Sequence, residues 1–259
     1  MISPNSFVDK NAKLGKNVTV SPFAVINANV EIGEGTWIGP HVTVMDGARI
    51  GKNCRIFPGA VISAIPQDLK FTGEETTVEI GDNTTIREFV TVNRGTKDRM
   101  KTSVGNNCLL MAYVHIAHDC AIGNNVILAN SVNLAGHINI EDWAILEGLV
   151  AVQQFIHIGA HSFVTGGSLV RKNVPPYVKA AREPLSYIGV NSVGLRRRCF
   201  SPERILQIED IYRTIYVRGY NVSNALNIVE KEAPASVEKE LIVRFIRDSK
   251  DGIIRGITA

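Results

Sequence analysis

Residues 104–140 read VGNNCLLMAYVHIAHDCAIGNNVILANSVNLAGHINI. An aliphatic residue recurs at every sixth position of this stretch, from Val104 to Ile140. The same phase extends from Ile2 to Val170, and aliphatic residues fill 26 of its 29 positions. The three exceptions are Asp68, Glu74 and Asp98. A period of six matches neither a 3.6-residue helix nor simple strand alternation, so it predicts a short strand, a turn and one buried aliphatic side chain per six residues.

Small residues at other positions of the hexad agree with this interpretation. Glycine often follows the aliphatic residue, as at Gly105 and Gly123, and asparagine or glycine often stands three places after it, as at Asn107 and Asn125. These residues tolerate the left-handed backbone of a tight turn. Three strands would close a triangular coil, and stacked coils would bury a continuous aliphatic column. The pattern resembles the left-handed parallel β-helix of the hexapeptide-repeat acyltransferases, and the resemblance supplies the handedness.

The repeat divides the chain into two expected domains. We expect an all-β left-handed parallel β-helix over residues 1–175, followed by a connector and a smaller α-helical domain over residues 176–259. The hexads are interrupted at about 63–79 and 93–103, which predicts two loops extruded from the coil. Both loops are candidates for function, because long loops on a rigid scaffold often carry it.

Beyond the repeat, the period becomes helical. The segment Asn173 to Tyr177 contains two consecutive prolines and cannot continue a regular strand. Ser201 before Pro202 is typical of a helix start. One face of this helix would carry Ile205, Ile208, Ile211, Tyr212 and Ile215. Further helices are expected at about 223–232 and 236–248.

Composition and charge exclude several classes of protein. The chain of 259 residues is 45% hydrophobic and 20% charged, which argues against disorder, and it has no apolar stretch long enough for a membrane span. We expect no secretory signal, and four cysteines without a C-x-x-C pair favour the cytoplasm. A net charge of +3 is too small for a typical nucleic-acid binder. Residues 171–259 carry a net +6, which indicates an anionic ligand or partner there.

One histidine cluster, His115-Ile116-Ala117-His118-Asp119, combines imidazoles with a carboxylate. Ile116 is the buried hexad residue, so both histidines would flank it near a corner of the coil. The carboxylate of Asp119 would orient His118 as a general base. His137 lies about one coil further on, so we expect it beside His118. The alternative is a histidine-rich surface patch.

We expect no metal site. The gamma-class carbonic anhydrases, another β-helix family, bind zinc through three histidines at a subunit interface. The spacings His115-x-x-His118 and His157-x-x-x-His161 do not reproduce the widely separated histidine and the close pair expected there.

Two charged motifs are candidates for substrate binding. Asp68 and Lys70 are two residues apart, so alternation would aim both side chains the same way, toward a hydroxyl and a phosphate. The run Arg196 to Arg198 would suit a diphosphate. The alternatives are a solvated ion pair and a surface cluster, and the residues by themselves favour these.

Several motifs occur together and in order along the chain. They are Gln67-Asp68-Leu69-Lys70, Arg94-Gly95-Thr96, His115 to Cys120, Leu134-Ala135-Gly136-His137, Gln154-Phe155, Asn173 to Tyr177, Gly189-Val190-Asn191 and Gly194 to Arg198. The combination resembles the acyl-carrier-protein:UDP-N-acetylglucosamine O-acyltransferase family of lipid A biosynthesis over essentially the whole chain. The resemblance implies a homotrimer with active sites between neighbouring β-helices. It also implies transfer of an R-3-hydroxyacyl group from acyl carrier protein to the glucosamine 3-hydroxyl of UDP-N-acetylglucosamine.

The resemblance also implies roles for individual residues. His118 would be the general base, Asp119 its orienting partner, and the Gly136 N–H an oxyanion donor. Asp68, Lys70, His115, His137 and Gln154 would hold the sugar and its phosphate, Asn191, Arg197 and Arg198 the nucleotide diphosphate or the carrier's phosphopantetheine, and Gly166 would limit the acyl pocket. No cofactor is implied beyond the thioester co-substrate. Gln153 and Val193 depart from the histidine and the acid expected at their positions.

Other functions remain in view. The N-acyltransferase of the same pathway has an additional N-terminal uridine-binding domain, for which the hexads starting at Ile2 leave no room. An acetyltransferase that uses coenzyme A would need neither a long acyl groove nor a basic end. A non-enzymatic scaffold or trimeric carbohydrate-binding module is the alternative from another class, and the clustered Asp68, Lys70, His118 and His137 argue against it. The acyl length and a 3-amino sugar variant stay open.

Overall fold

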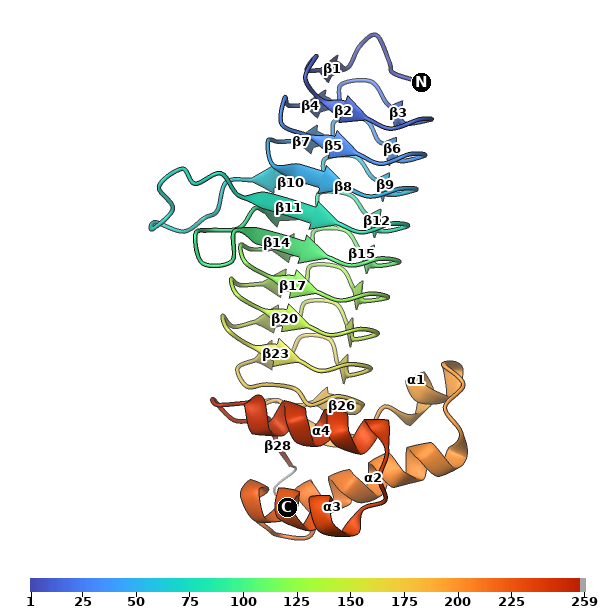
Figure 1. Ribbon diagram of the computed structural model, residues 1–259, viewed down its shortest axis with the longest axis vertical. Helices are drawn as coiled ribbons and strands as arrows, with labels where there is room; N and C mark the ends of the chain where they lie inside the picture. The colour runs from blue at the N-terminus through green and yellow to red at the C-terminus, as the bar shows by residue number, and fades with distance from the viewer. Residues whose placement is uncertain (257–259) are drawn as a thin grey trace.

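The computed structural model describes residues 1–256 and shows a left-handed parallel β-helix that leads into a helical C-terminal part (Figure 1). Three parallel sheets form the sides of the prism, and we name each after its first strand. The β1 sheet contains β1 (Phe7–Val8), β4 (Val25–Ile26), β7 (Thr43–Val44), β10 (Val61–Ala64), β13 (Thr91–Asn93), β16 (His115–Ile116), β19 (Asn133–Leu134), β22 (Ala151–Val152) and β25 (Leu169–Val170).

The other two sides have the same construction. The β2 sheet contains β2 (Lys13–Leu14), β5 (Glu31–Ile32), β8 (Ala48–Ile50), β11 (Thr77–Ile80), β14 (Lys101–Val104), β17 (Ala121–Ile122), β20 (Asn139–Ile140) and β23 (His157–Ile158). The β3 sheet contains β3 (Thr19–Val20), β6 (Trp37–Ile38), β9 (Arg55–Ile56), β12 (Thr85–Ile86), β15 (Leu109–Leu110), β18 (Ile127–Leu128), β21 (Ile145–Leu146), β24 (Phe163–Val164), β26 (Val178–Ala181), β27 (Ser186–Val190) and β28 (Arg255–Gly256).

The hexad residues fill the interior of the prism. Ile116 pairs with Leu134 in the next coil, 18 residues on, and both side chains are fully buried. The backbone three places after each of them has a positive φ, 58° at Asp119 and 63° at His137. Asparagine and glycine were expected at such corners, but this chain also places histidine, aspartate and aromatic residues there. The corners therefore carry functional side chains at a fixed spacing along the prism.

The two loops preserve the phase of the repeat because they insert whole hexads. Across the first loop Ile62 pairs with Val92, 30 residues on, and across the second Ile86 pairs with Leu110, 24 residues on. The excess over the usual 18 is two hexads and then one. The strands flanking these loops reach into the ranges expected as loops, since β11 starts at Thr77 and β14 at Lys101. The segments outside strands are therefore residues 65–76 and 94–100.

The C-terminal part covers one end of the prism (Figure 1). Its helices are α1 (Ser192–Arg197), α2 (Pro202–Tyr216), α3 (Val222–Glu232) and α4 (Val237–Asp248). The hydroxyl of Ser201 caps α2 by accepting the Arg204 N–H, as its sequence predicts. The aliphatic face expected for this helix is buried. Across the described residues 1–256, none of the helices is long and apolar enough to cross a membrane.

Candidate active site

Both loops leave the prism at the same edge, where the β1 sheet turns into the β2 sheet. The first loop joins β10 to β11, and the second joins β13 to β14. The next coils place His118 and Asp119, then Gly136 and His137, and then Gln154 and Phe155 at this edge. We call it the β1/β2 edge. One edge of the prism thus gathers most of the residues expected to be functional.

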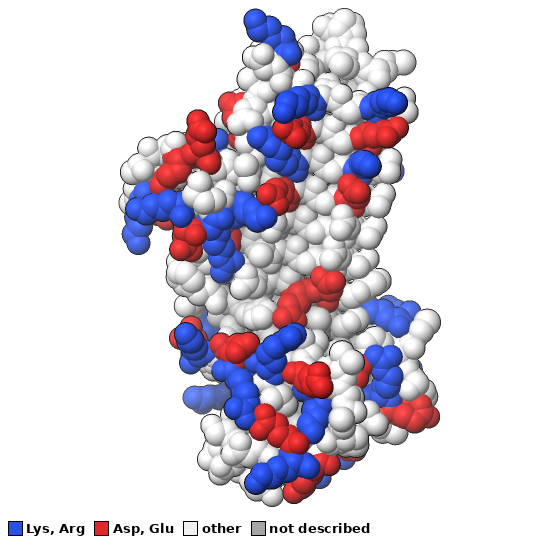
Figure 2. All heavy atoms as spheres, viewed as in Figure 1, with Lys and Arg blue, Asp and Glu red and all other residues white. Residues whose placement is uncertain are grey.

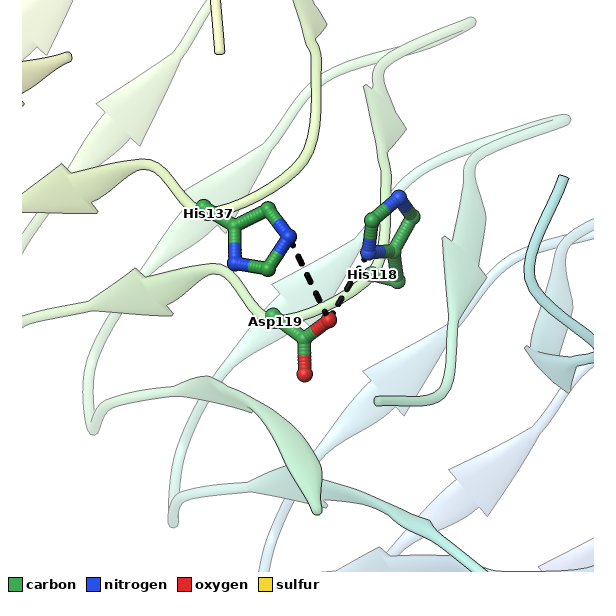
Figure 3. Close-up of side chains that lie close together, drawn as sticks. All are labelled: His118, Asp119 and His137. Atoms are coloured by element: carbon green, nitrogen blue, oxygen red, sulfur yellow. Dashed lines mark hydrogen bonds and ion pairs between the residues drawn. The ribbon is translucent and has the colours of Figure 1, made fainter. Parts of the chain in front are cut away.

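His118 and Asp119 form a buried pair at this edge (Figure 3). The Nδ1 of His118 lies 2.8 Å from Oδ2 of Asp119. His118 is 5% exposed and Asp119 is fully buried. The other ring nitrogen, Nε2, lies 3.9 Å from Oδ2 of Asp68 in the first loop. A carboxylate on Nδ1 fixes the imidazole so that Nε2 faces the loops, which is the arrangement of an oriented general base.

The second loop holds the carboxylate of Asp119 in place. Oδ1 accepts the backbone N–H groups of Thr96 at 3.0 Å and Arg99 at 3.2 Å, and Oδ2 accepts the Thr96 hydroxyl at 2.7 Å. Burial raises the pKa of Asp119, but the hydrogen bonds from Thr96, His118 and Arg99 outweigh it and hold the pKa below its usual value. Asp119 is therefore ionised and rigid, as a carboxylate that orients His118 must be.

Gly136 lies directly against the ring of His118. A Cβ atom at Gly136 would come within 2.6 Å of Cε1 and 2.8 Å of Nε2 of His118, so a larger residue would displace the imidazole. Among residues 1–256, the N–H of Gly136 donates to no backbone carbonyl. A free N–H beside Nε2 is able to donate to an oxygen that develops negative charge there.

His137 lies beside this pair. Its ring centroid is 5.1 Å from that of His118 and 4.6 Å from that of Phe155, on which it stacks. Its Nε2 is 3.8 Å from Oδ2 of Asp119, so the carboxylate lies between the two imidazoles (Figure 3). Asp68, Lys70, Glu74, Thr96, Lys97, Asp98, His137 and Phe155 line a cavity of about 240 Å³ here.

His115 and Gln154 lie at the border of this region. His115 is on β16, on the outer face of the β1 sheet, where its Nδ1 is 2.7 Å from the Thr91 hydroxyl. Burial lowers the pKa of His115. The side chain of Gln154 is exposed at the β1/β2 edge, one coil beyond Gly136.

The remaining expected site residues lie elsewhere on the same chain. Gly166 is at the edge between the β3 and β1 sheets. Asn191 and Arg197 border a cavity of about 400 Å³ on the β3 sheet. Arg198 donates to the Trp143 carbonyl at 3.1 Å and lies 3.4 Å from Nδ1 of His161, at the edge between the β2 and β3 sheets. A single chain therefore does not bring Gly166, Asn191, Arg197 or Arg198 to His118.

The nitrogen and oxygen atoms of His118, Asp119 and His137 lie within 4.8 Å of one another, a spacing that also suits a metal ion. The hydrogen bonds tell against this use of Asp119. Both of its carboxylate oxygens already accept donors from Thr96 and Arg99, and Oδ2 faces His118 as well. A metal would have to compete with all of these donors.

Comparison with known families gives two matches. A family model described as UDP N-acetylglucosamine O-acyltransferase, domain 2, matches residues 173–257. A model described as bacterial transferase hexapeptide (six repeats) matches residues 29–64 and 101–136. Together they span the β-helix and the helical part.

Full-length relatives decide the family. The acyl-[acyl-carrier-protein]–UDP-N-acetylglucosamine O-acyltransferase of Janthinobacterium sp. (strain Marseille) is 45% identical over 258 residues, 99% of this chain and 98% of that protein. The UDP-N-acetylglucosamine acyltransferase structure from Bacteroides fragilis is 52% identical, with a TM-score of 0.97 over 98% of this chain and 100% of that one. The structure from Francisella novicida is 42% identical, with a TM-score of 0.96 over 98% and 94%.

The chain belongs to the acyl-carrier-protein:UDP-N-acetylglucosamine O-acyltransferase family. The family resemblance and the left-handed β-helix expected from the sequence are confirmed. The relatives match over nearly their whole length, so the agreement covers the helical part as well as the repeat.

In this member of the O-acyltransferase family, the site contains residues that the motifs did not identify. Thr96 and Arg99 hold Asp119, and Glu74 and Asp98 line the cavity beside His137. A sequence signal for two of them existed. The hexad positions without an aliphatic residue are Asp68, Glu74 and Asp98, and all three line this cavity. Acids at interior-phase positions therefore marked the loops that build the site.

Proposed function

We propose that this protein transfers an R-3-hydroxyacyl group from acyl carrier protein to the 3-hydroxyl of UDP-N-acetylglucosamine, the first step of lipid A biosynthesis. The observation that carries the proposal is the buried His118–Asp119 pair, with the free N–H of Gly136 against the same imidazole. Relatives at 45% and 52% identity carry the name of this activity.

In the proposed mechanism, Nε2 of His118 removes the proton of the sugar 3-hydroxyl as its oxygen attacks the thioester carbonyl. Asp119 stabilises the resulting imidazolium through Nδ1, at 2.8 Å. The Gly136 N–H donates to the oxyanion of the tetrahedral intermediate. The C–S bond then breaks, and the proton on His118 passes to the departing phosphopantetheine thiolate. The thioester is a co-substrate, and the proposal includes no separate cofactor and no metal.

Asp68 and Lys70 support a sugar-nucleotide site beside the base. Both line the cavity that His137 also borders, and Asp68 approaches Nε2 of His118. A carboxylate accepts sugar hydroxyls, and an ammonium group binds a phosphate. In the proposal, His115, His137 and Gln154 complete this side of the site.

We further propose a homotrimer in which a neighbouring chain completes each site. Gly166, Asn191, Arg197 and Arg198 lie on faces and edges of the prism away from His118, so they reach a bound substrate only from another copy. Gly166 would then limit the acyl groove, and Asn191, Arg197 and Arg198 would contact the diphosphate or the phosphopantetheine. The four cysteines are unpaired, which suits a reducing cytoplasm.

The experiment that tests this function combines the purified protein, UDP-N-acetylglucosamine and a panel of acyl and 3-hydroxyacyl carrier-protein thioesters, with mass detection of the product. We expect one monoacylated sugar nucleotide and release of free carrier thiol in equal amount. A 3-amino analogue and acyl-coenzyme A donors run beside it. Transfer only from coenzyme A, or no transfer from any 3-hydroxyacyl carrier thioester, would contradict the proposal.

A further inference from the structure

Asp98 contacts His137 from the second loop. Its Oδ2 lies 3.1 Å from Nδ1 of His137. The Asp98 side chain is 63% exposed, whereas that of His137 is 13% exposed. Exposed ion pairs in general contribute little, so the question is whether this carboxylate is held in place.

The backbone on both sides of Asp98 is anchored. Thr96 donates its N–H and its hydroxyl to the carboxylate of Asp119. Arg99 donates its N–H to the same carboxylate, and its guanidinium to the Asp119 carbonyl at 2.9 Å and to Oδ1 of Asn139 at 2.8 Å. Asp98 therefore projects from a short segment tied to two successive coils, and it loses little freedom when it contacts His137.

His137 is consequently held on three sides. Phe155 stacks on one face of the ring at 4.6 Å, Asp119 faces Nε2 at 3.8 Å, and Asp98 faces Nδ1. The stack fixes the plane of the ring but not its rotation within that plane. A carboxylate on Nδ1 fixes this rotation, and with it the direction of Nε2.

We propose that Asp98 is a positioning residue that fixes the ring of His137 and thereby sets the affinity of the enzyme for the sugar nucleotide. The inference rests on the proposed function, in which His137 binds that substrate. Asp98 acts through His137 and does not contact the reacting atoms.

The test is a double-mutant cycle of Asp98→Ala and His137→Ala, with Asp98→Asn as the conservative variant. Asp98→Ala should raise KM for UDP-N-acetylglucosamine about twofold to fivefold, the range for a pair with one exposed partner, and leave kcat within about twofold. Asp98→Asn should restore most of the affinity, because its amide oxygen still accepts the Nδ1 proton. In the His137→Ala background, adding Asp98→Ala should change KM by less than about 1.5-fold. Glu31→Ala, which removes an exposed ion pair on the β2 sheet, is the matched control.

Three results would overturn the inference. An Asp98→Ala enzyme with wild-type KM would show that the contact has no role. An undiminished effect in the His137→Ala background would show that Asp98 acts directly on the substrate. Equal losses in kcat and affinity, together with a lower melting temperature, would show that Asp98 only supports the loop.

A crystal structure of Asp98→Ala keeps the inference separate from the proposed function. If the wild-type protein fails to acylate the sugar nucleotide, the proposed function is wrong, and the structure still tests the positioning role. A His137 ring that rotates or loses order in the variant supports that role. A ring that keeps its place contradicts it.

Discussion

Two histidines at corners of the coil have opposite surroundings. His118 faces the ionised carboxylate of Asp119, whereas His161 packs between the rings of Trp143 and Tyr177 and faces the guanidinium of Arg198. Burial and the charge of Arg198 lower the pKa of His161 to about 4. The same corner geometry thus supports a catalytic pair at one edge and a neutral structural ring at another.

The lowered pKa of His161 predicts how stability depends on pH. As pH falls below about 6.5, the unfolded chain binds a proton at this histidine and the folded chain does not, so stability is lost between pH 6.5 and 4. His161→Phe should remove part of this loss, and phenylalanine already occupies the equivalent backbone conformation at Phe23, Phe89 and Phe155. Allowing for partial exposure, we expect the fall in Tm between pH 7 and 5 to shrink by about 3 °C, on the order of 1 kcal/mol. Equal falls in both proteins would contradict this.

At the scale of elements, the repeat was predictable because each strand contributes one inward aliphatic side chain. The phase survived the loops because they insert whole hexads, as the pairings of Ile62 with Val92 and Ile86 with Leu110 show. The adjacency of His118 and His137 followed from the length of one coil.

The fold of the second loop was not predictable from periodicity. Its approach to the edge depends on hydrogen bonds from Thr96 and Arg99 to Asp119, which join residues more than 15 positions apart outside the repeat. The placement of Gly166 and Arg197 away from His118 also has no counterpart in a one-chain pattern. Spacing along one chain gives the order of the coils but not which edges meet between copies.

The edge between the β3 and β1 sheets carries a prediction about acyl length. A Cβ at Gly166 would meet the Gly148 carbonyl at 3.1 Å, which is tight but leaves a side chain room to project outward. If this edge ends the acyl groove, Gly166→Met should shift the preferred donor to shorter chains, since one methylene too many typically changes kcat/KM by about 10–200-fold. A donor series on wild type and variant, with Tm measured alongside, checks this. An unchanged optimum in a variant of unchanged Tm would contradict it.

On the scale of the whole molecule, charge is unevenly distributed. In Figure 2, charged side chains gather over the N-terminal coils with their loops and over the C-terminal helices, and a largely uncharged stretch of the prism separates them. The N-terminal group includes the exposed pairs Lys13–Glu31 and Lys101–Glu79 on the β2 sheet. The C-terminal third holds the excess of positive charge. This favours the C-terminal third as the docking region for an acidic carrier protein.

Within that region the three consecutive arginines are not equivalent. Arg196 and Arg197 are exposed, whereas Arg198 is committed to the Trp143 carbonyl and to His161. Reversing the charge of Arg196 and Arg197 together should raise KM for acyl carrier protein about fivefold to tenfold at low salt, and the difference should shrink as salt screens the charges. Steady-state kinetics across a salt series measures this. A KM for the carrier that is independent of salt in the wild-type enzyme would rule out electrostatic docking.

The central claim is that His118 is the base of an acyl transfer to UDP-N-acetylglucosamine, and its most direct test is kcat for His118→Ala with a 3-hydroxyacyl carrier-protein donor. The imidazole lies at a corner outside the aliphatic column, so the variant should keep its fold, oligomeric mass and Tm. Loss of a general base predicts a fall in kcat on the order of 10²–10⁴-fold. A folded variant that retained more than about a tenth of the wild-type kcat would contradict the assignment of His118.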